Sequence, residues 1–145
     1  PFAVGFAKAA ELACLARDRE RARIGKLRDY FWDKLKGIAP RAELTVPCVG
    51  NFPEPSGAEG FLPNILNVYF PGTSAEHLVT KLDILGVAVS SGSACRTRAF
   101  RASHVIQAAG FSKERARQSI RFSFGRPTNK THMDMALKKI KTAFK

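Results

Sequence analysis

The feature that most constrains the fold is a stretch without proline over residues 2–35. In its second half, apolar residues recur every three to four positions, at Ile24, Leu27, Phe31 and Leu35. This predicts an amphipathic helix, or two helices in series. Such a helix would be about 50 Å long, whereas a compact domain of this size has a radius of gyration of about 15 Å. We therefore expect either a kink near Gly25 or a first half that packs on a part of the protein outside this chain.

A small apolar face in the first half favours the second interpretation. It consists of Phe6, Ala10 and Ala13, and alanine side chains let a neighbouring element approach closely. The chain of 145 residues is itself of a length that suits one domain.

The remaining sequence alternates between strand and helix patterns. We predict strands at residues 42–46, 64–70, 86–90 and 119–124. We predict helices at residues 75–85, 104–109 and 113–118 and a last helix that starts at Thr128 or Asn129, with serine, threonine or asparagine caps. The strand at 86–90 is too apolar for an edge position. This order predicts an α+β domain, with a small, mainly antiparallel sheet and helices on one face.

The charge of the chain is strongly positive, at +12 from 24 basic and 12 acidic residues. Such a balance raises the possibility of a nucleic-acid partner. However, the basic residues are spread over the first helix, the region around residue 95 and the last helix, and no known nucleic-acid module accompanies them. We therefore expect a solvated basic surface first, and a docking surface for an acidic protein or an RNA second; a nucleic-acid partner is not favoured.

Other composition signals exclude several classes of protein. No apolar run approaches the ~20 residues that a membrane span needs, so no membrane association is expected. The three cysteines lack C-x-x-C spacing, which indicates neither a disulfide framework nor a metal site and favours a reducing compartment. No targeting signal is apparent, so we expect a cytoplasmic protein, or one of an organelle matrix if a targeting segment has been removed.

Cys95 is the strongest candidate for a reactive residue. It ends a run of small residues, SSGSAC, that predicts an exposed flexible loop. Arg96 and Arg98 follow it, and guanidinium groups turned toward the sulfur would lower the pKa of the thiol below its free value of about 8.5. A buried, inert thiol is the usual role of a free cysteine. We assign that role to Cys14, and for Cys48 both interpretations stay open.

Arg121 is the second candidate. It lies in the alternating segment 119–124, where isoleucine and phenylalanine face one side and Arg121 faces the other. A guanidinium there can bind a carboxylate through two parallel hydrogen bonds, or it can be a surface arginine in a loose ion pair; the local sequence does not decide. Of the histidines, His77 and His132 are expected at the surface, and His104 is an auxiliary candidate as a base for the thiol.

Four segments, in order and at matching spacing, resemble the pyridoxal-phosphate-dependent cysteine desulfurases, which are class V aminotransferases. The segments are LPNILNVYFPG, LDILGVAVSSGSAC, SHVIQAAG and ARQSIRFSFGRPTN. The opening VGFAKAAELA resembles the helix that links the two domains of that family. The resemblance covers nearly the whole chain. It implies that residues 1–145 are the C-terminal small domain of a fold-type I enzyme, with residues 1–37 as the linker helix.

The resemblance also implies roles for the two candidates. The cysteine of the SSGSAC motif takes sulfur from substrate cysteine as a persulfide, which places that role on Cys95. The arginine of the SIRFSFGR motif holds the substrate carboxylate, which places that role on Arg121. The family does not usually carry the basic pair Arg96 and Arg98, so we interpret it as a local feature that tunes the thiol or contacts an acidic sulfur acceptor.

The cofactor lysine of the family lies in a serine-rich HK motif of the large domain, and this chain has no such motif. The resemblance therefore implies that pyridoxal phosphate binds to a domain absent from this chain, with no cofactor and no full activity expected here. Its cofactor-binding residues stay unknown. Implied partners are L-cysteine, a sulfur acceptor such as an iron–sulfur scaffold, and a second copy of the full-length enzyme as a homodimer.

Two other functions stay open. One is a selenocysteine lyase or related aminotransferase of the same fold. The other is a non-catalytic basic module that binds RNA or an acidic protein. The presence of both SSGSAC and Arg121 favours the desulfurase, because a binding module needs neither.

Overall fold

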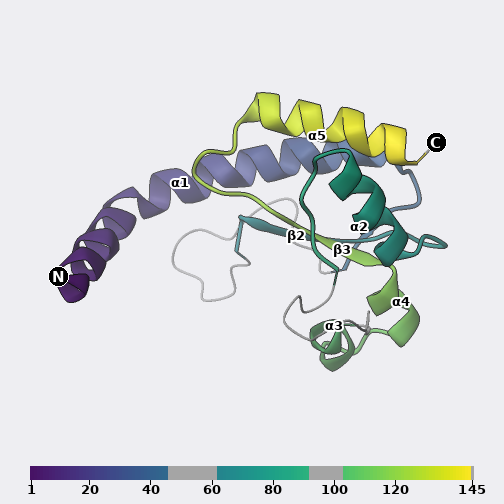
Figure 1. Cartoon of the computed structure of the whole chain (residues 1–145), viewed down its shortest axis with the longest axis horizontal. Helices are drawn as coiled ribbons and strands as arrows, with labels where there is room; N and C mark the ends of the chain where they lie inside the picture. The colour runs from purple at the N-terminus through teal and green to yellow at the C-terminus, as the bar shows by residue number, and fades with distance from the viewer. Residues whose placement is uncertain (46–61, 92–102, 145) are drawn as a thin grey trace.

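The computed structural model describes residues 1–45, 62–91 and 103–144. In chain order the elements are α1 (Phe2–Ile38), β1 (Glu43–Leu44), β2 (Ile65–Tyr69), α2 (Ala75–Ile84), α3 (His104–Ala108), α4 (Lys113–Arg117), β3 (Ser119–Ser123) and α5 (Lys130–Ala143). The strands form an antiparallel sheet in the order β1-β2-β3. Helices α1, α2 and α5 cover one face of it (Figure 1). The predicted α+β fold class is confirmed.

The ends of the short helices follow the predicted capping residues. Ser74, Ser103 and Ser112 cap α2, α3 and α4, and each side chain accepts a hydrogen bond from a backbone N–H in the first turn. Asn129 does the same for α5. Gly110, after α3, has φ of 88°, a backbone conformation that glycine adopts without the steric cost of a Cβ. Local sequence thus determines where these helices begin and end.

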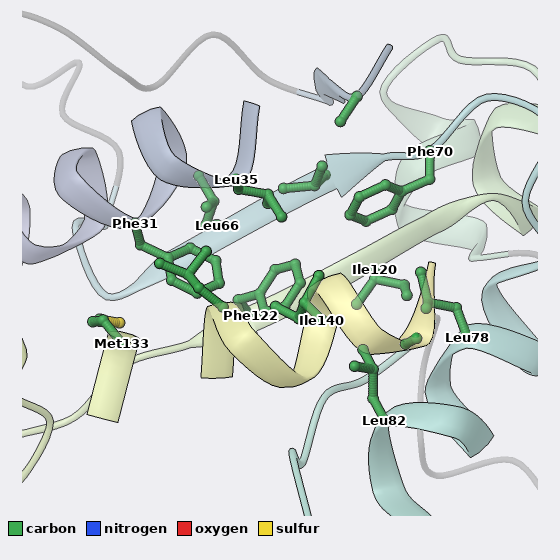
Figure 2. Close-up of a cluster of buried hydrophobic side chains, with 14 of the residues drawn as sticks. Phe31, Leu35, Leu66, Phe70, Leu78, Leu82, Ile120, Phe122, Met133 and Ile140 are labelled. Carbon is green, nitrogen blue, oxygen red and sulfur yellow. The ribbon is translucent and has the colours of Figure 1, made fainter. Parts of the chain in front are cut away.

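The core lies between the sheet and the three covering helices (Figure 2). The inward side chains of β2 and β3 alternate with outward ones, as the strand pattern predicted. Phe31 of α1 packs against Phe122 and Phe124, with ring centroids 5.1 and 5.6 Å apart. The buried side chains of α5 complete this layer, and they are Met133, Leu137, Ile140 and Ala143.

Replacing Phe31 with alanine should lower the free energy of unfolding by about 3–5 kcal/mol, because the change removes a buried ring and leaves a cavity. Phe31 is 1% exposed, whereas Phe6 on the same helix is 78% exposed. Phe6→Ala is therefore the matched control and should leave the unfolding midpoint nearly unchanged. Urea unfolding of both variants measures the difference. Equal destabilisation by the two substitutions would contradict the assignment of Phe31 to the core.

Helix α1 runs without a break through Gly25. Of the two alternatives, the structure agrees with a long helix whose first half extends beyond the domain (Figure 1), and what packs on that half stays a prediction. Gly25 is buried, and the helix packs on the domain from Ile24 onward. The N-terminal half extends away from the sheet (Figure 1) and leaves apolar side chains such as Phe2 and Leu15 exposed. In the described ranges, no helix is long and apolar enough to cross a membrane.

Cys14 lies in this extended half and is exposed. The prediction that Cys14 is a small buried residue is therefore wrong for this chain. The physical reason is that burial of a helix face depends on a neighbouring element, and the described part of the domain places none beside this half of α1.

Two polar side chains fix the second half of α1 to the domain. Arg23 donates hydrogen bonds to the backbone carbonyls of Thr128 and Arg126, at 2.7 and 3.0 Å, just before α5. Tyr30 donates to a carboxylate oxygen of Asp134 at 2.6 Å, which raises the pKa of the tyrosine hydroxyl because the neutral form makes this bond. These contacts join α1 to α5 along one side of the core.

The segment 86–90 is not a strand, which corrects the prediction of an interior strand there. Only Ser90 pairs with the sheet, through a single bridge to Arg121 of β3. Val87 and Val89 are half-buried and pack on the core, which explains their apolar character without strand pairing. At the other edge of the sheet, β1 is shorter than predicted and ends at Leu44.

Candidate functional site

Arg121 is exposed on the face of the sheet that points away from the core. The strand alternation places it there, since Ile120 and Phe122 on either side of it are buried. Among the described residues, no carboxylate forms a salt bridge with its guanidinium. The sequence left open whether Arg121 binds a carboxylate or forms a loose ion pair at the surface. In this region the structure shows no partner for such an ion pair, and the guanidinium is available to an external anion.

Arg121 belongs to a row of polar residues that crosses the sheet, formed by Thr45, Asn67, Arg121 and Ser90. The strand register pairs Asn67 of β2 directly with Arg121 of β3. Ser90 bridges to Arg121 on the other side. Thr45 follows β1, and its backbone N–H donates to the carbonyl of Asn67 at 3.0 Å. We call these four residues the polar row.

Side-chain hydrogen bonds order one end of the polar row. The Thr45 hydroxyl donates to Oδ1 of Asn67 at 2.6 Å. Ser119 lies two residues before Arg121 on β3, and its hydroxyl donates to the carbonyl of Arg115 at 2.7 Å. Thr45 and Ser119 are both buried, although they lie on the face opposite the core. This end of the row is therefore held in place by bonds shielded from water.

Arg115 explains that shielding, because its side chain lies over the sheet beside the polar row. The guanidinium is 4.5 Å from the Tyr69 ring centroid and 5.0 Å from that of Phe111, within the range of cation–π contacts. It also donates to Glu43 at 2.8 Å and to the carbonyl of Leu44 at 3.0 Å. Arg115 thus holds α4 against β1 and β2, and it leaves Arg121 as the exposed cation of the row.

Of the predicted site residues, the described part of the chain includes Arg121 and His104. Cys95, Arg96 and Arg98 lie outside the described residues, as does Cys48. The described chain reaches Ser91, next to the Ser90 bridge to Arg121, directly before the segment that contains Cys95.

The three histidines are all exposed, which confirms the surface positions predicted for His77 and His132. His104 is the first residue of α3, and Ser103 before it is the buried cap. Within the described ranges no hydrogen bond joins His104 to the polar row. Its role as a base for the thiol therefore stays a prediction.

Asn67 and Thr45, the neighbours of Arg121 in the polar row, were not singled out from the sequence. The signal for Asn67 was present, because asparagine is depleted in strands and this one interrupts the strand formers of β2 at an outward position. Thr45 gave no such signal, since threonine is an ordinary strand residue. Its place beside Asn67 follows only from the pairing of distant segments.

Two hollows lined by described residues lie away from the polar row. A hollow of about 520 Å³ is lined by the first turns of α2 and the end of α5, and a smaller one of about 190 Å³ lies beside it. Neither includes a residue of the polar row. No group of three or more potential metal ligands occurs among the described residues. In this part of the chain, the polar row presents one exposed guanidinium, that of Arg121, beside neutral polar side chains.

Comparisons with known proteins show what the chain as a whole is similar to. No family model matches the chain. A protein named cysteine desulfurase IscS from Dictyoglomus turgidum is 35% identical over 134 residues, and one of the same name from an Enterobacter strain is 36% identical over 140 residues. A solved structure titled NifS-like protein matches with a TM-score of 0.75 at 26% identity over 97% of this chain.

These matches span most of the chain but a minor part of the relatives. They cover 92 and 97% of this chain, and 32 and 31% of the two desulfurases. The solved NifS-like chain is matched over 32% of its length. The resemblance stated from the sequence motifs is confirmed, and the chain is consistent with a C-terminal fragment of a pyridoxal-phosphate-dependent cysteine desulfurase.

Proposed function

We propose that this chain is the C-terminal domain of an enzyme that converts L-cysteine to L-alanine and keeps the sulfur as a persulfide on Cys95. The observation that carries the proposal is the exposed guanidinium of Arg121, which has no carboxylate partner in the described region and adjoins the start of the Cys95 segment. The similarity of nearly the whole chain to proteins named cysteine desulfurase supports the same function.

Arg121 binds the carboxylate of the substrate in this proposal. A guanidinium presents paired N–H donors that match the two oxygens of a carboxylate, and such charge-assisted bonds are stronger than neutral ones. The position on a strand supports this role, because β3 is paired on both sides at Arg121 and holds its backbone in place. A bound amino acid would thus be oriented by its carboxylate.

Cys95 supplies the nucleophile. Its thiolate attacks the sulfur of the bound cysteine, so that an S–S bond forms while the C–S bond of the substrate breaks. The substrate carbon takes the electron pair and a proton and leaves as alanine. Covalent geometry supports access, since five residues of chain from Ser90 to Cys95 span at most about 18 Å. The segment is thus long enough to bring the thiol toward a substrate held at Arg121.

The cofactor that such chemistry needs is pyridoxal phosphate, which stabilises negative charge on the substrate carbon when it is bound. An enzyme lysine that forms a Schiff base is typically desolvated in an apolar pocket. The lysines in the described ranges are all exposed or half-buried. These residues do not fit a cofactor site by themselves, which supports placing the cofactor in the remaining two thirds of the protein.

The partners follow from the same proposal. The persulfide on Cys95 needs an acceptor, for which we propose a sulfur-carrier or iron–sulfur scaffold protein, in iron–sulfur cluster assembly or in tRNA thiolation. The excess of basic residues favours an acidic surface on that acceptor. We also propose that the full-length enzyme is a homodimer that works in the cytoplasm or an organelle matrix.

The test compares the complete enzyme with this chain alone. With L-cysteine and pyridoxal phosphate, the complete enzyme should form alanine, and the isolated chain should form none because it lacks the cofactor domain. L-selenocysteine tested in parallel separates a desulfurase from a selenocysteine lyase. A complete enzyme that leaves L-cysteine unchanged would contradict the proposed function, and turnover of L-selenocysteine alone would favour the lyase.

A further inference from the structure

We propose that the side-chain amide of Asn67 is a second donor to the substrate carboxylate and that Thr45 is the positioning residue that orients it. The inference rests on the proposed function, in which Arg121 binds that carboxylate. It assigns two residues of the polar row to recognition of an amino-acid substrate, with Asn67 in contact with the ligand and Thr45 acting through Asn67.

The strand register makes Asn67 and Arg121 one of the closely spaced pairs of the sheet. The backbone N–H and carbonyl of Arg121 both bond to Ser90, at 2.7 and 3.2 Å. The carbonyl of Asn67 bonds to Thr45 on the opposite side. Asn67 and Arg121 are thus a pair without hydrogen bonds between their backbones, and such pairs have Cα atoms only about 4.5 Å apart with their side chains closest together.

The two side chains also share one face of the sheet. Leu66 and Val68, on either side of Asn67, are buried in the core, as are the neighbours of Arg121. Asn67 and Arg121 therefore both project from the outer face. An anion bound by the guanidinium would lie within reach of the asparagine amide.

The hydrogen bond from Thr45 determines which end of the amide is available. The distance from Thr45 Oγ1 to Asn67 Oδ1 is 2.6 Å, which is typical of an O–H donor to an oxygen and short for a bond that involves nitrogen. The amide oxygen therefore faces Thr45. The Nδ2 group, with two N–H donors, is the other end of the amide, and no described residue accepts a hydrogen bond from it.

Thr45 is well suited to hold this orientation. It is buried, and its backbone N–H is fixed by the bond to Asn67. The hydroxyl has one proton, which goes to Asn67. The Ser119 hydroxyl donates its own proton to the Arg115 carbonyl, so it could only accept from Thr45. Its oxygen is 3.4 Å from Thr45 Oγ1, against 2.6 Å for Asn67 Oδ1, so the shorter bond to Asn67 takes the proton. Arg121 and the Asn67 amide together offer donors for both oxygens of a carboxylate.

The test measures recognition of the carboxylate in the complete enzyme loaded with its cofactor. Asn67→Ala should raise KM for L-cysteine roughly tenfold, the effect of losing one hydrogen bond to a charged group. The inhibition constant of cysteamine, which has the amine and thiol of cysteine but no carboxylate, should stay unchanged. Thr45→Val should raise KM by less, because the amide remains but is no longer oriented.

Further variants separate recognition from folding. Asn67→Asp keeps an acceptor for Thr45 and the shape of the side chain, so it should fold, yet its negative charge should raise KM more than Asn67→Ala does. Asn64→Ala makes the same type of change at an exposed position just before β2 and should leave KM unchanged. Thermal unfolding of each variant checks that the domain remains folded.

The outcomes are distinct. A selective rise in KM for L-cysteine, without a change for cysteamine, would support the assignment. Equal changes for cysteine and cysteamine, or an unchanged KM in Asn67→Asp, would overturn it while leaving Arg121 and the proposed function intact. An unaltered complete enzyme that forms no alanine would overturn the proposed function itself, and the assignment of Asn67 with it.

Discussion

Replacing Cys95 with serine in the complete enzyme should lower alanine formation from L-cysteine by at least about a thousandfold, because a hydroxyl at neutral pH is a far weaker nucleophile than a thiolate. Without the thiolate, no group accepts the sulfur when the C–S bond of the substrate breaks. The absorbance of the bound cofactor should remain, since Cys95 takes no part in holding it. Parallel assays of alanine and of protein-bound sulfur measure the effect.

The matched control for this substitution is Cys14→Ser. Cys14 is also a free thiol and is exposed on the extended half of α1. Its replacement should leave alanine formation within the error of the wild type. Loss of cofactor absorbance in Cys95→Ser would mean that Cys95 is structural, and equal activity of the two serine variants would exclude Cys95 as the sulfur carrier.

Replacing Arg121 with alanine should raise KM for L-cysteine roughly a hundredfold, because the substitution removes two charge-assisted hydrogen bonds to the carboxylate. The value of kcat should change much less, since the contact is made in the ground state and in the transition state alike. Arg121→Lys should recover only part of the loss, because a lysine lacks the paired donors of a guanidinium. Steady-state kinetics over a wide range of cysteine concentrations measure these values.

Arg117 provides the control for Arg121. It is an exposed arginine at the end of α4, outside the polar row, and its replacement by alanine removes the same charge from the domain. KM should therefore stay unchanged in Arg117→Ala. Unchanged saturation kinetics in Arg121→Ala would remove the carboxylate-binding role, and an equal change in both variants would point to net charge as the cause.

Local sequence was sufficient for the elements that depend on local chemistry. The capping serines marked the starts of α2, α3 and α4, and the alternation of apolar residues identified β2 and β3. The outward position of Arg121 followed from the same alternation. These features depend on residues within a few positions of each other, which is why the sequence alone predicts them.

Features that depend on distant segments were not predicted. Val87 and Val89 pack on the core without belonging to a strand, so their apolar character was mistaken for strand pairing. The exposure of Cys14 depends on whether another element packs beside α1, and the residues of α1 do not reveal this. The polar row also depends on pairing between segments far apart in the chain, and only Arg121 of its members stood out beforehand.

The most direct test of the account is mass spectrometry of the complete enzyme after brief exposure to L-cysteine, with mapping of the peptides that contain Cys14, Cys48 and Cys95. The account predicts an added mass of about 32 Da, one sulfur atom, on Cys95 alone. No added sulfur, or sulfur spread evenly over the three thiols, would contradict the assignment of Cys95 as the persulfide carrier.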